Sequence, residues 1–69
     1  MIQFNQMPEV LTAKHIAEYL NISRRRVYEL FQLKPSQGGI PNFDIGISKR
    51  VIKEDFEEWI NSKKVEKLG

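Results

Sequence analysis

The chain has 69 residues, no cysteine and a single histidine. This length allows one domain with a small core, and the composition excludes disulfides and a zinc site built from cysteine or histidine. The net charge is only +2, but basic side chains far outnumber acidic ones between residues 23 and 53, and residues 54–69 are acidic on balance. The central stretch therefore suits a polyanionic partner, and we expect the last part of the chain to face away from it.

No segment approaches the roughly 18 consecutive apolar residues that a membrane span needs. Residues 1–8 lack the charged start and apolar middle of a secretory signal, so we expect a cytoplasmic protein without a membrane contact. Residues 1–9 show no periodic pattern, and Pro8 argues against a helix across that point. We expect an N-terminal arm or a short strand there, with no assigned role.

Two helices separated by a short break are predicted next. The first covers residues 12–20, where Thr12 is an acceptable N-cap and the apolar residues at helical spacing are Ala13, Ile16, Ala17 and Leu20. In the break, Asn21 tolerates a left-handed C-cap, Ile22 can fill the angle between the helices, and Ser23 caps the next helix. The second helix runs from about residue 24 to residue 33, and its inward face consists of Val27, Leu30 and Phe31.

A loop and a hairpin are predicted after the second helix. Two prolines and two glycines between residues 34 and 41 stop the helix and indicate a loop. Beyond it, Phe43, Ile45 and Val51 alternate with polar neighbours. This alternation predicts a short β-hairpin, which we call the wing, with its turn at residues 46–48.

A third helix is expected from Lys53 onward. Its core residues are Phe56, Trp59 and Ile60, and this face should cover the first helix and the hairpin. Residues 63–69 form a C-terminal tail that either extends this helix or frays. The predicted fold is mainly α with a small β-hairpin, a winged helix-turn-helix domain that covers residues 10–62.

The spacing of five residues in the first two helices is that of the helix-turn-helix pattern, with Asn21 in place of the usual Gly: Ala17, Asn21, Ile22, Val27 and Leu30. A similarity to a known family extends over three sequence blocks, which occur in the order LTAKHIAEYLNISRRRVYEL, IPNFDIG and EDFEEWI. Over roughly residues 10–60 the chain resembles the excisionase family of DNA-binding domains, which are winged helices related to the DNA-binding part of MerR-type regulators.

This resemblance implies a DNA-binding protein without enzymatic activity or cofactor. Members of the family include phage and transposon excisionases that steer an integrase towards excision, and small activators that control excision genes. It therefore implies double-stranded DNA as the partner, with an integrase or other recombinase as a further partner. Because a domain this small offers few base contacts, we also expect neighbouring copies of the chain to cooperate at repeated sites. The chain departs from the family in a longer loop at residues 34–40 and in a wing without a dense basic tip.

The candidate DNA-binding residues lie on the second helix and the wing: Ser23, Arg24, Arg25, Arg26, Tyr28, Glu29, Gln32, Lys49 and Arg50. The N-terminal turn of a recognition helix is the part that reaches base edges. At 100° per residue Arg25, Glu29 and Gln32 point away from the core, and Arg25 can donate two hydrogen bonds to guanine. We expect the phosphates to be bound by Arg24, Arg26, Tyr28 and Gln32.

Several alternatives stay open. Glu29 either accepts a hydrogen bond from cytosine or pairs with Arg25 at i, i+4, and Tyr28 either binds phosphate or leans on the hairpin. Lys49 and Arg50 are placed on the wing to reach the minor groove or its phosphates, but one of them is expected to point towards the domain, because side chains alternate along a strand. We interpret His15 as structural and Trp59 as a core residue.

Other functional classes also remain. A small transcriptional regulator of the same fold is one alternative. A protein-interaction adaptor that recruits an integrase or other partner through the acidic third helix, Val65 and Leu68 is another. We do not expect an enzyme, because the sequence offers no nucleophile pair, metal cluster or phosphate-binding glycine loop.

Overall fold

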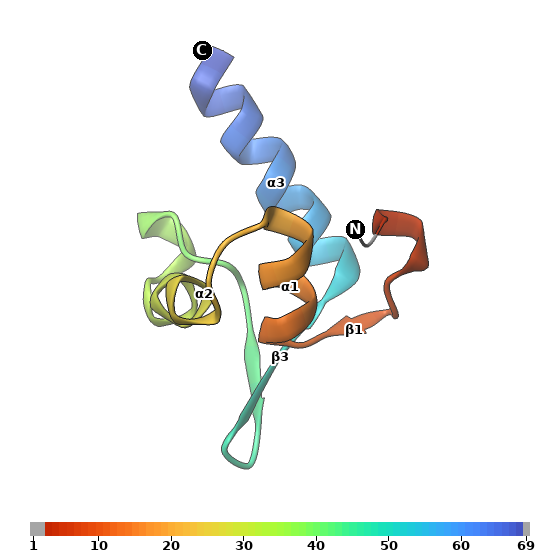
Figure 1. Cartoon of the computed structure of the whole chain (residues 1–69). Helices are drawn as coiled ribbons and strands as arrows, with labels where there is room; N and C mark the ends of the chain where they lie inside the picture. Colours follow the sequence, from red (N-terminus) through yellow and green to blue (C-terminus); the bar gives the residue numbers. More distant parts are fainter. Residues whose placement is uncertain (1–2, 69) are drawn as a thin grey trace.

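Three α-helices and a small antiparallel sheet form the fold in the computed structural model, which describes residues 3–68 (Figure 1). The elements in chain order are a 3-10 turn Phe4–Gln6, β1 Val10–Leu11, α1 Ala13–Leu20, α2 Arg24–Gln32, a second 3-10 turn Pro35–Gln37, β2 Phe43–Ile45, β3 Ser48–Ile52 and α3 Lys53–Leu68. The fold is mainly helical with a β-hairpin, which confirms the predicted winged helix-turn-helix. Within the described residues, no helix is long and apolar enough to cross a membrane.

The start and end of α1 follow from its capping residues. The Thr12 side chain accepts a hydrogen bond from the His15 backbone N–H at 3.4 Å, and Nδ1 of His15 accepts one from the Thr12 backbone N–H at 3.0 Å. This reciprocal pair satisfies two N–H groups that the helix leaves free. At the other end Asn21 takes the left-handed conformation with φ 58°, so the predicted C-cap is confirmed.

The next helix, α2, is bounded in the same way. The Ser23 hydroxyl accepts a hydrogen bond from the Arg26 backbone N–H at 3.1 Å, which confirms Ser23 as N-cap. At the C-terminal end the Asn42 side chain donates to the carbonyls of Phe31 at 3.1 Å and of Ile40 at 2.8 Å. Asn42 therefore ties the end of α2 to the chain that leads into the wing.

The loop between α2 and the wing is packed rather than free. Gly39 passes so close to α2 that a Cβ there would lie 2.0 Å from the Leu33 carbonyl oxygen. The indole N–H of Trp59 on α3 donates to the Gly38 carbonyl at 3.1 Å. The loop thus fixes α2 relative to α3.

The sheet has the strand order β1-β3-β2, with both pairs antiparallel. The β2–β3 hairpin is the predicted wing, and its Ile45↔Ser48 register leaves a two-residue turn of Gly46 and Ile47. The third strand, β1, pairs with β3 at Leu11↔Val51. In Figure 1 the wing extends away from the helices, and all three residues of β2 are exposed.

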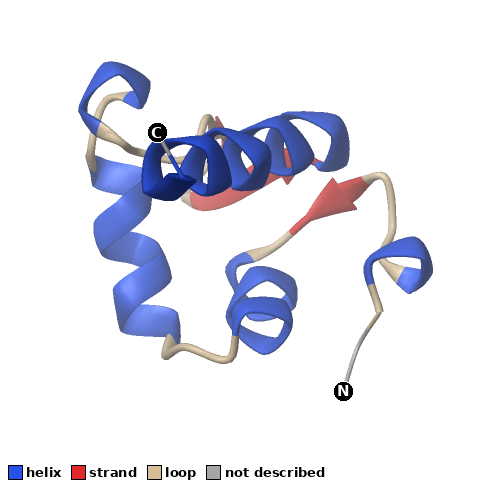
Figure 2. Cartoon of the chain, turned by 90° about the horizontal axis from the view of Figure 1, so that it is seen from above, coloured by secondary structure: helices blue, strands red, loops and turns tan. Residues whose placement is uncertain are grey.

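The core lies where α1, α2, α3 and the sheet meet. Its fully buried side chains are Leu11, Ile16, Val27, Ile40, Val51 and Phe56. In Figure 2 α3 crosses over the strands, and the N-terminal 3-10 turn lies on the opposite side of the molecule from α2. The helix α3 continues through residues 63–68, so the predicted tail is an extension of this helix as far as the structure describes it.

The N-terminal segment takes part in the core, a role that the sequence did not indicate. Met7 is only 4% exposed. The Phe4 ring packs edge-on against Tyr19 at 5.6 Å and parallel to Phe56 at 6.4 Å between ring centroids. Residues that precede the predicted domain therefore contribute to its packing.

Candidate nucleic-acid interface

The predicted recognition surface is the outer face of α2. All of its candidate residues are exposed: Ser23, Arg24, Arg25, Arg26, Tyr28, Glu29 and Gln32. The three arginines occupy the first turn of the helix. Because Val27 and Phe31 anchor the opposite face in the core, the first turn is held in a fixed orientation towards solvent.

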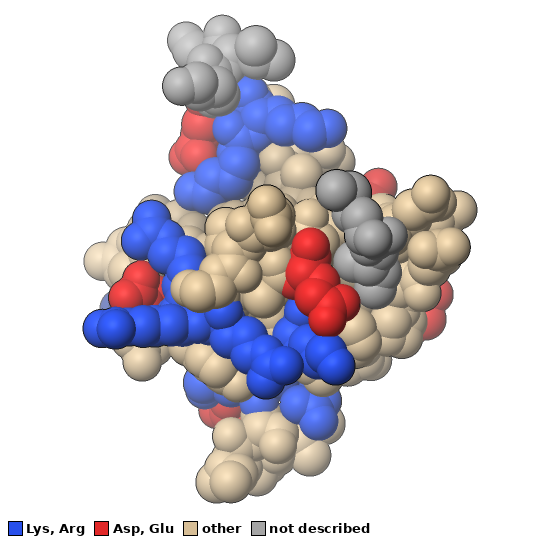
Figure 3. Space-filling model, viewed as in Figure 1, with Lys and Arg blue, Asp and Glu red and all other residues tan. Residues whose placement is uncertain are grey.

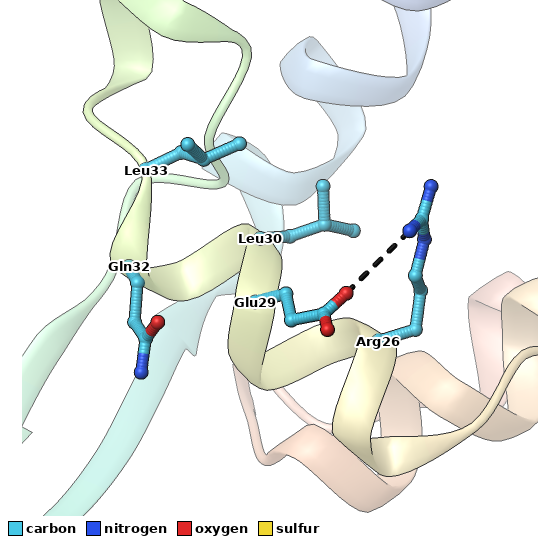
Figure 4. Close-up of a pocket in the computed structure, with 5 residues that line it drawn as sticks. All are labelled: Arg26, Glu29, Leu30, Gln32 and Leu33. Atoms are coloured by element: carbon cyan, nitrogen blue, oxygen red, sulfur yellow. Dashed lines mark hydrogen bonds and ion pairs between the residues drawn. The ribbon is translucent and has the colours of Figure 1, made fainter.

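The ion pair on α2 joins Glu29 to Arg26 and not to Arg25, the arginine in one of the two alternatives left open. Glu29 accepts from Arg26 Nη1 at 3.5 Å, and both side chains are more than half exposed (Figure 4). The sequence alternative that paired Glu29 with Arg25 is therefore wrong in its partner, because the i, i+3 arrangement is adopted instead of i, i+4. Among the side chains that the structure describes, no ion pair of Arg25 is found.

Figure 4 also separates the two sides of α2. Leu30 lies on the side of the Arg26–Glu29 pair, whereas the Gln32 side chain points away from that pair. Leu33 is 42% exposed and, together with Leu30, contributes apolar atoms to a shallow hollow beside the ion pair. The one cation on this flank, Arg26, is paired with Glu29, so the flank is less suited to phosphates than the side of α2 that bears Arg24.

A second hollow joins the two helices to the wing. It is lined by Thr12, Ala13, Lys14, Arg24, Tyr28, Ile47, Ser48, Lys49 and Arg50. Four of these side chains are cationic and none is acidic. We call this hollow the basic groove; it brings the first residue of α2 and the wing to one surface.

The two basic residues of the wing differ in their partners. Lys49 Nζ lies 2.7 Å from Asp44 Oδ1, across the β2–β3 ladder where the two residues face each other. Arg50 Nη1 donates to the Lys49 carbonyl at 2.9 Å. Both side chains are half-buried and both line the basic groove. Lys49 is therefore partly neutralised, and Arg50 is the wing's more available cation.

The position of Tyr28 bears on two alternatives, that it binds phosphate or that it packs on the hairpin. Its ring packs edge-on against Phe31, with centroids 5.9 Å apart, yet the residue stays 47% exposed. It lines the basic groove together with wing residues. The phenol is thus placed to contact a partner that enters the groove, with its ring held by α2.

Sequence reasoning missed part of this surface, above all Lys14 and Ile47, and misplaced one residue. Lys14 and Ile47 line the basic groove, but only the tertiary fold brings the start of α1 next to the wing. Lys53 was counted with the basic stretch, whereas its Nζ donates to the Met7 carbonyl at 3.2 Å and lies 4.9 Å from the Phe4 ring centroid. It therefore holds the N-terminal segment.

The charge distribution agrees with this division of the surface. Figure 3 shows Lys and Arg side chains gathered across the middle of the face, over α1 and α2 and above the wing. The first turn of α3 instead carries Glu54 and Asp55. A polyanion is attracted to the helix-and-wing side and repelled by the start of α3.

Two further residues singled out from the sequence, His15 and Trp59, have structural partners. His15 belongs to the cap of α1, and Trp59 stacks on Phe56 at 6.1 Å and bonds to Gly38. Both agree with their predicted structural roles.

Comparison with known proteins adds the family. The model of a helix-turn-helix domain family matches residues 10–64, which include α1, α2, the wing and most of α3. Neither the curated proteins nor the solved structures gave a significant match. The family match covers most of the chain and agrees with the helix-turn-helix geometry, so the chain belongs to this helix-turn-helix domain family of DNA-binding domains.

Proposed function

We propose that the chain is a sequence-specific double-stranded DNA-binding protein that acts as an excisionase-type directionality factor of a phage or integrative element. The observation that carries the DNA-reading part is the basic groove, in which four cations join the start of α2 to the wing. The excision role is supported by the resemblance of the three sequence blocks to excisionases.

The docking geometry follows from the position of the arginines. The first turn of α2 enters the major groove, where Arg25 donates to guanine O6 and N7. Arg24, Lys14 and Arg50 bind phosphates from the basic groove and fix the register. Tyr28 and Gln32 add polar contacts beside them.

The size of the domain limits the length of its site. The longest extent of the protein is 37 Å, close to the roughly 34 Å of one turn of B-DNA. One copy therefore covers about one turn and makes few base contacts, which limits its specificity. High occupancy requires repeated sites bound by neighbouring copies, or a recombinase bound next to them.

An excision assay tests the biological part of this proposal. In cells that carry the element, the excised circle is quantified with the gene present, deleted, or replaced by the Arg25→Ala variant. The proposal predicts that deletion abolishes the circle and that the variant fails to restore it. An unchanged amount of circle, with altered transcription of a neighbouring gene, contradicts the excision role and supports the transcriptional regulator.

The C-terminal part of α3 favours an adaptor as the second candidate. In Figure 1 this helix extends beyond the rest of the fold, and Val65 is 68% exposed on it. The Leu68 side chain, also assigned to this surface from the sequence, lies outside the described part. A partner retained on the protein after nuclease treatment, with no duplex bound at any salt, would support the adaptor.

A further inference from the structure

The tip of the wing is apolar and strongly exposed. Ile47 is 102% exposed and Ile45 is 60% exposed, and only Gly46 separates them. Gly46 has φ +63° in the two-residue turn, as expected for the first turn position of a tight hairpin. The β2–β3 ladder thus presents an isoleucine at the far end of the wing, where it contributes nothing to the core.

The tip has no charge of its own to offer a phosphate. The nearest cation on the wing, Lys49, is bound to Asp44 at 2.7 Å, and Arg50 is farther down β3, where its side chain bonds to the chain. Wings that enter a narrow minor groove by electrostatic attraction need a free Arg or Lys. The tip itself must therefore contact its partner in another way, while Arg50 remains available to phosphates lower on the wing.

The cationic residues near the tip indicate what kind of partner it contacts. Ile47 lines the basic groove, whose cations include Lys14, Arg24 and Arg50. An apolar residue at the edge of a cationic surface fits a partner that is anionic on its outside and apolar between stacked layers. Duplex DNA has both features, since phosphates surround stacked bases.

We propose that Ile47 is an apolar wedge that enters the minor groove next to the α2 contact and partly unstacks one base step. This inference rests on the proposed duplex binding. Apolar side chains inserted in this way kink the duplex by roughly 20–90°. Pyrimidine–purine steps unstack most easily, so the site contains a TA or CA/TG step at the wing position.

The test uses the duplex selected by the wild-type protein. The fluorescent base 2-aminopurine, placed at successive steps, reports unstacking, and dyes at the two ends report bending. The wild-type protein raises the fluorescence at one step and shortens the end-to-end distance. Ile47→Ala removes both signals and weakens binding about tenfold, the loss expected for one buried aliphatic side chain. Val65→Ala, which shortens an exposed side chain on α3, changes none of these.

The outcomes separate this inference from the proposed function. If the wild-type protein binds the duplex and Ile47→Ala keeps the same fluorescence, bending and affinity, the wedge alone is overturned. If the wild-type protein binds no duplex, the wedge and the proposed function are both overturned. Ile47→Arg gives a further check. If the wing merely rests on phosphates, this variant binds the duplex more tightly and bends it as the wild-type protein does, and this result would overturn the wedge. A dimer in the absence of DNA that Ile47→Ala dissolves would make the tip a self-association surface and also overturn the wedge.

Discussion

The three consecutive arginines of α2 have different surroundings, although they are neighbours in the sequence. Arg24 lines the basic groove beside the wing, and Arg26 pairs with Glu29. Arg25 lies between them on the outer face and makes no ion pair with any described side chain. Successive side chains diverge by about 100° around a helix, so each arginine meets a different part of a bound duplex.

We predict that Arg25→Ala and Arg24→Ala affect binding in different ways. Loss of a bidentate guanine contact lowers specific binding by about 1–3 kcal/mol and relaxes one base position. Loss of a phosphate contact weakens binding to all sequences alike. Binding curves on the selected site, its single-base variants and random DNA distinguish the two. Equal losses on specific and random DNA for both variants would contradict the assignment.

Glu29 limits the charge that α2 offers to DNA. We predict that Glu29→Ala frees Arg26, tightens binding to every duplex and steepens the salt dependence by up to about 0.9, the value for one phosphate. The free energy of unfolding changes by less than about 1 kcal/mol, because the pair is exposed. Salt titrations and urea unfolding measure both effects. If Glu29→Ala instead lost the base preference at one position only, this would show that Glu29 accepts a hydrogen bond from cytosine.

The direction of each side chain on α2 could be predicted from the sequence, but its partner could not. The helical period places Arg25, Glu29 and Gln32 outward, and all three are exposed. Both Arg25 and Arg26 lie within one turn of Glu29, and the choice between them depends on side-chain rotamers. No sequence pattern encodes that choice.

At the scale of elements, the loop at residues 34–41 is the most closely constrained connection. Gly39 has no room for a Cβ against the Leu33 carbonyl, and the neighbouring Gly38 carbonyl accepts from Trp59. The prolines and glycines predicted a loop. Its contact with α3 depends on residues 21 positions apart, which local patterns do not reveal.

We predict that Gly39→Ala strongly destabilises the protein, because the added methyl group displaces the loop from α2. Gly46→Ala is the matched control: a Cβ there meets nothing within 4 Å, and only its positive φ costs energy, about 1–2 kcal/mol. Urea unfolding of the two variants should show the larger loss for Gly39→Ala. The reverse order would show that the loop is not packed as described.

At the scale of the whole molecule, the N-terminal segment completes the core. The carbonyls of Met7 and Glu9 accept hydrogen bonds from Lys53, at the start of α3. The segment then continues into β1, which pairs with β3. These contacts escaped sequence reasoning because a two-residue strand and an aperiodic segment carry no pattern, whereas the longer helices and the hairpin do.

We predict that Met7→Ala lowers the free energy of unfolding by about 2–4 kcal/mol, as for other buried Met-to-Ala changes. A domain of this size has a small free energy of unfolding, so the midpoint temperature of thermal unfolding should fall markedly. Asn5→Ala, at an exposed position of the same segment, should change the free energy by less than about 0.5 kcal/mol. An unaffected Met7→Ala variant would contradict the packing of this segment against the core.

The central claim is that α2 and the wing bind one duplex through the basic groove. The most direct test is selection of DNA by the purified protein, followed by binding to the recovered site at several salt concentrations. The account predicts an enriched motif of about one helical turn and a log–log salt slope of roughly −3 or steeper, at about 0.9 per phosphate. No enriched motif and no dependence on salt would contradict it.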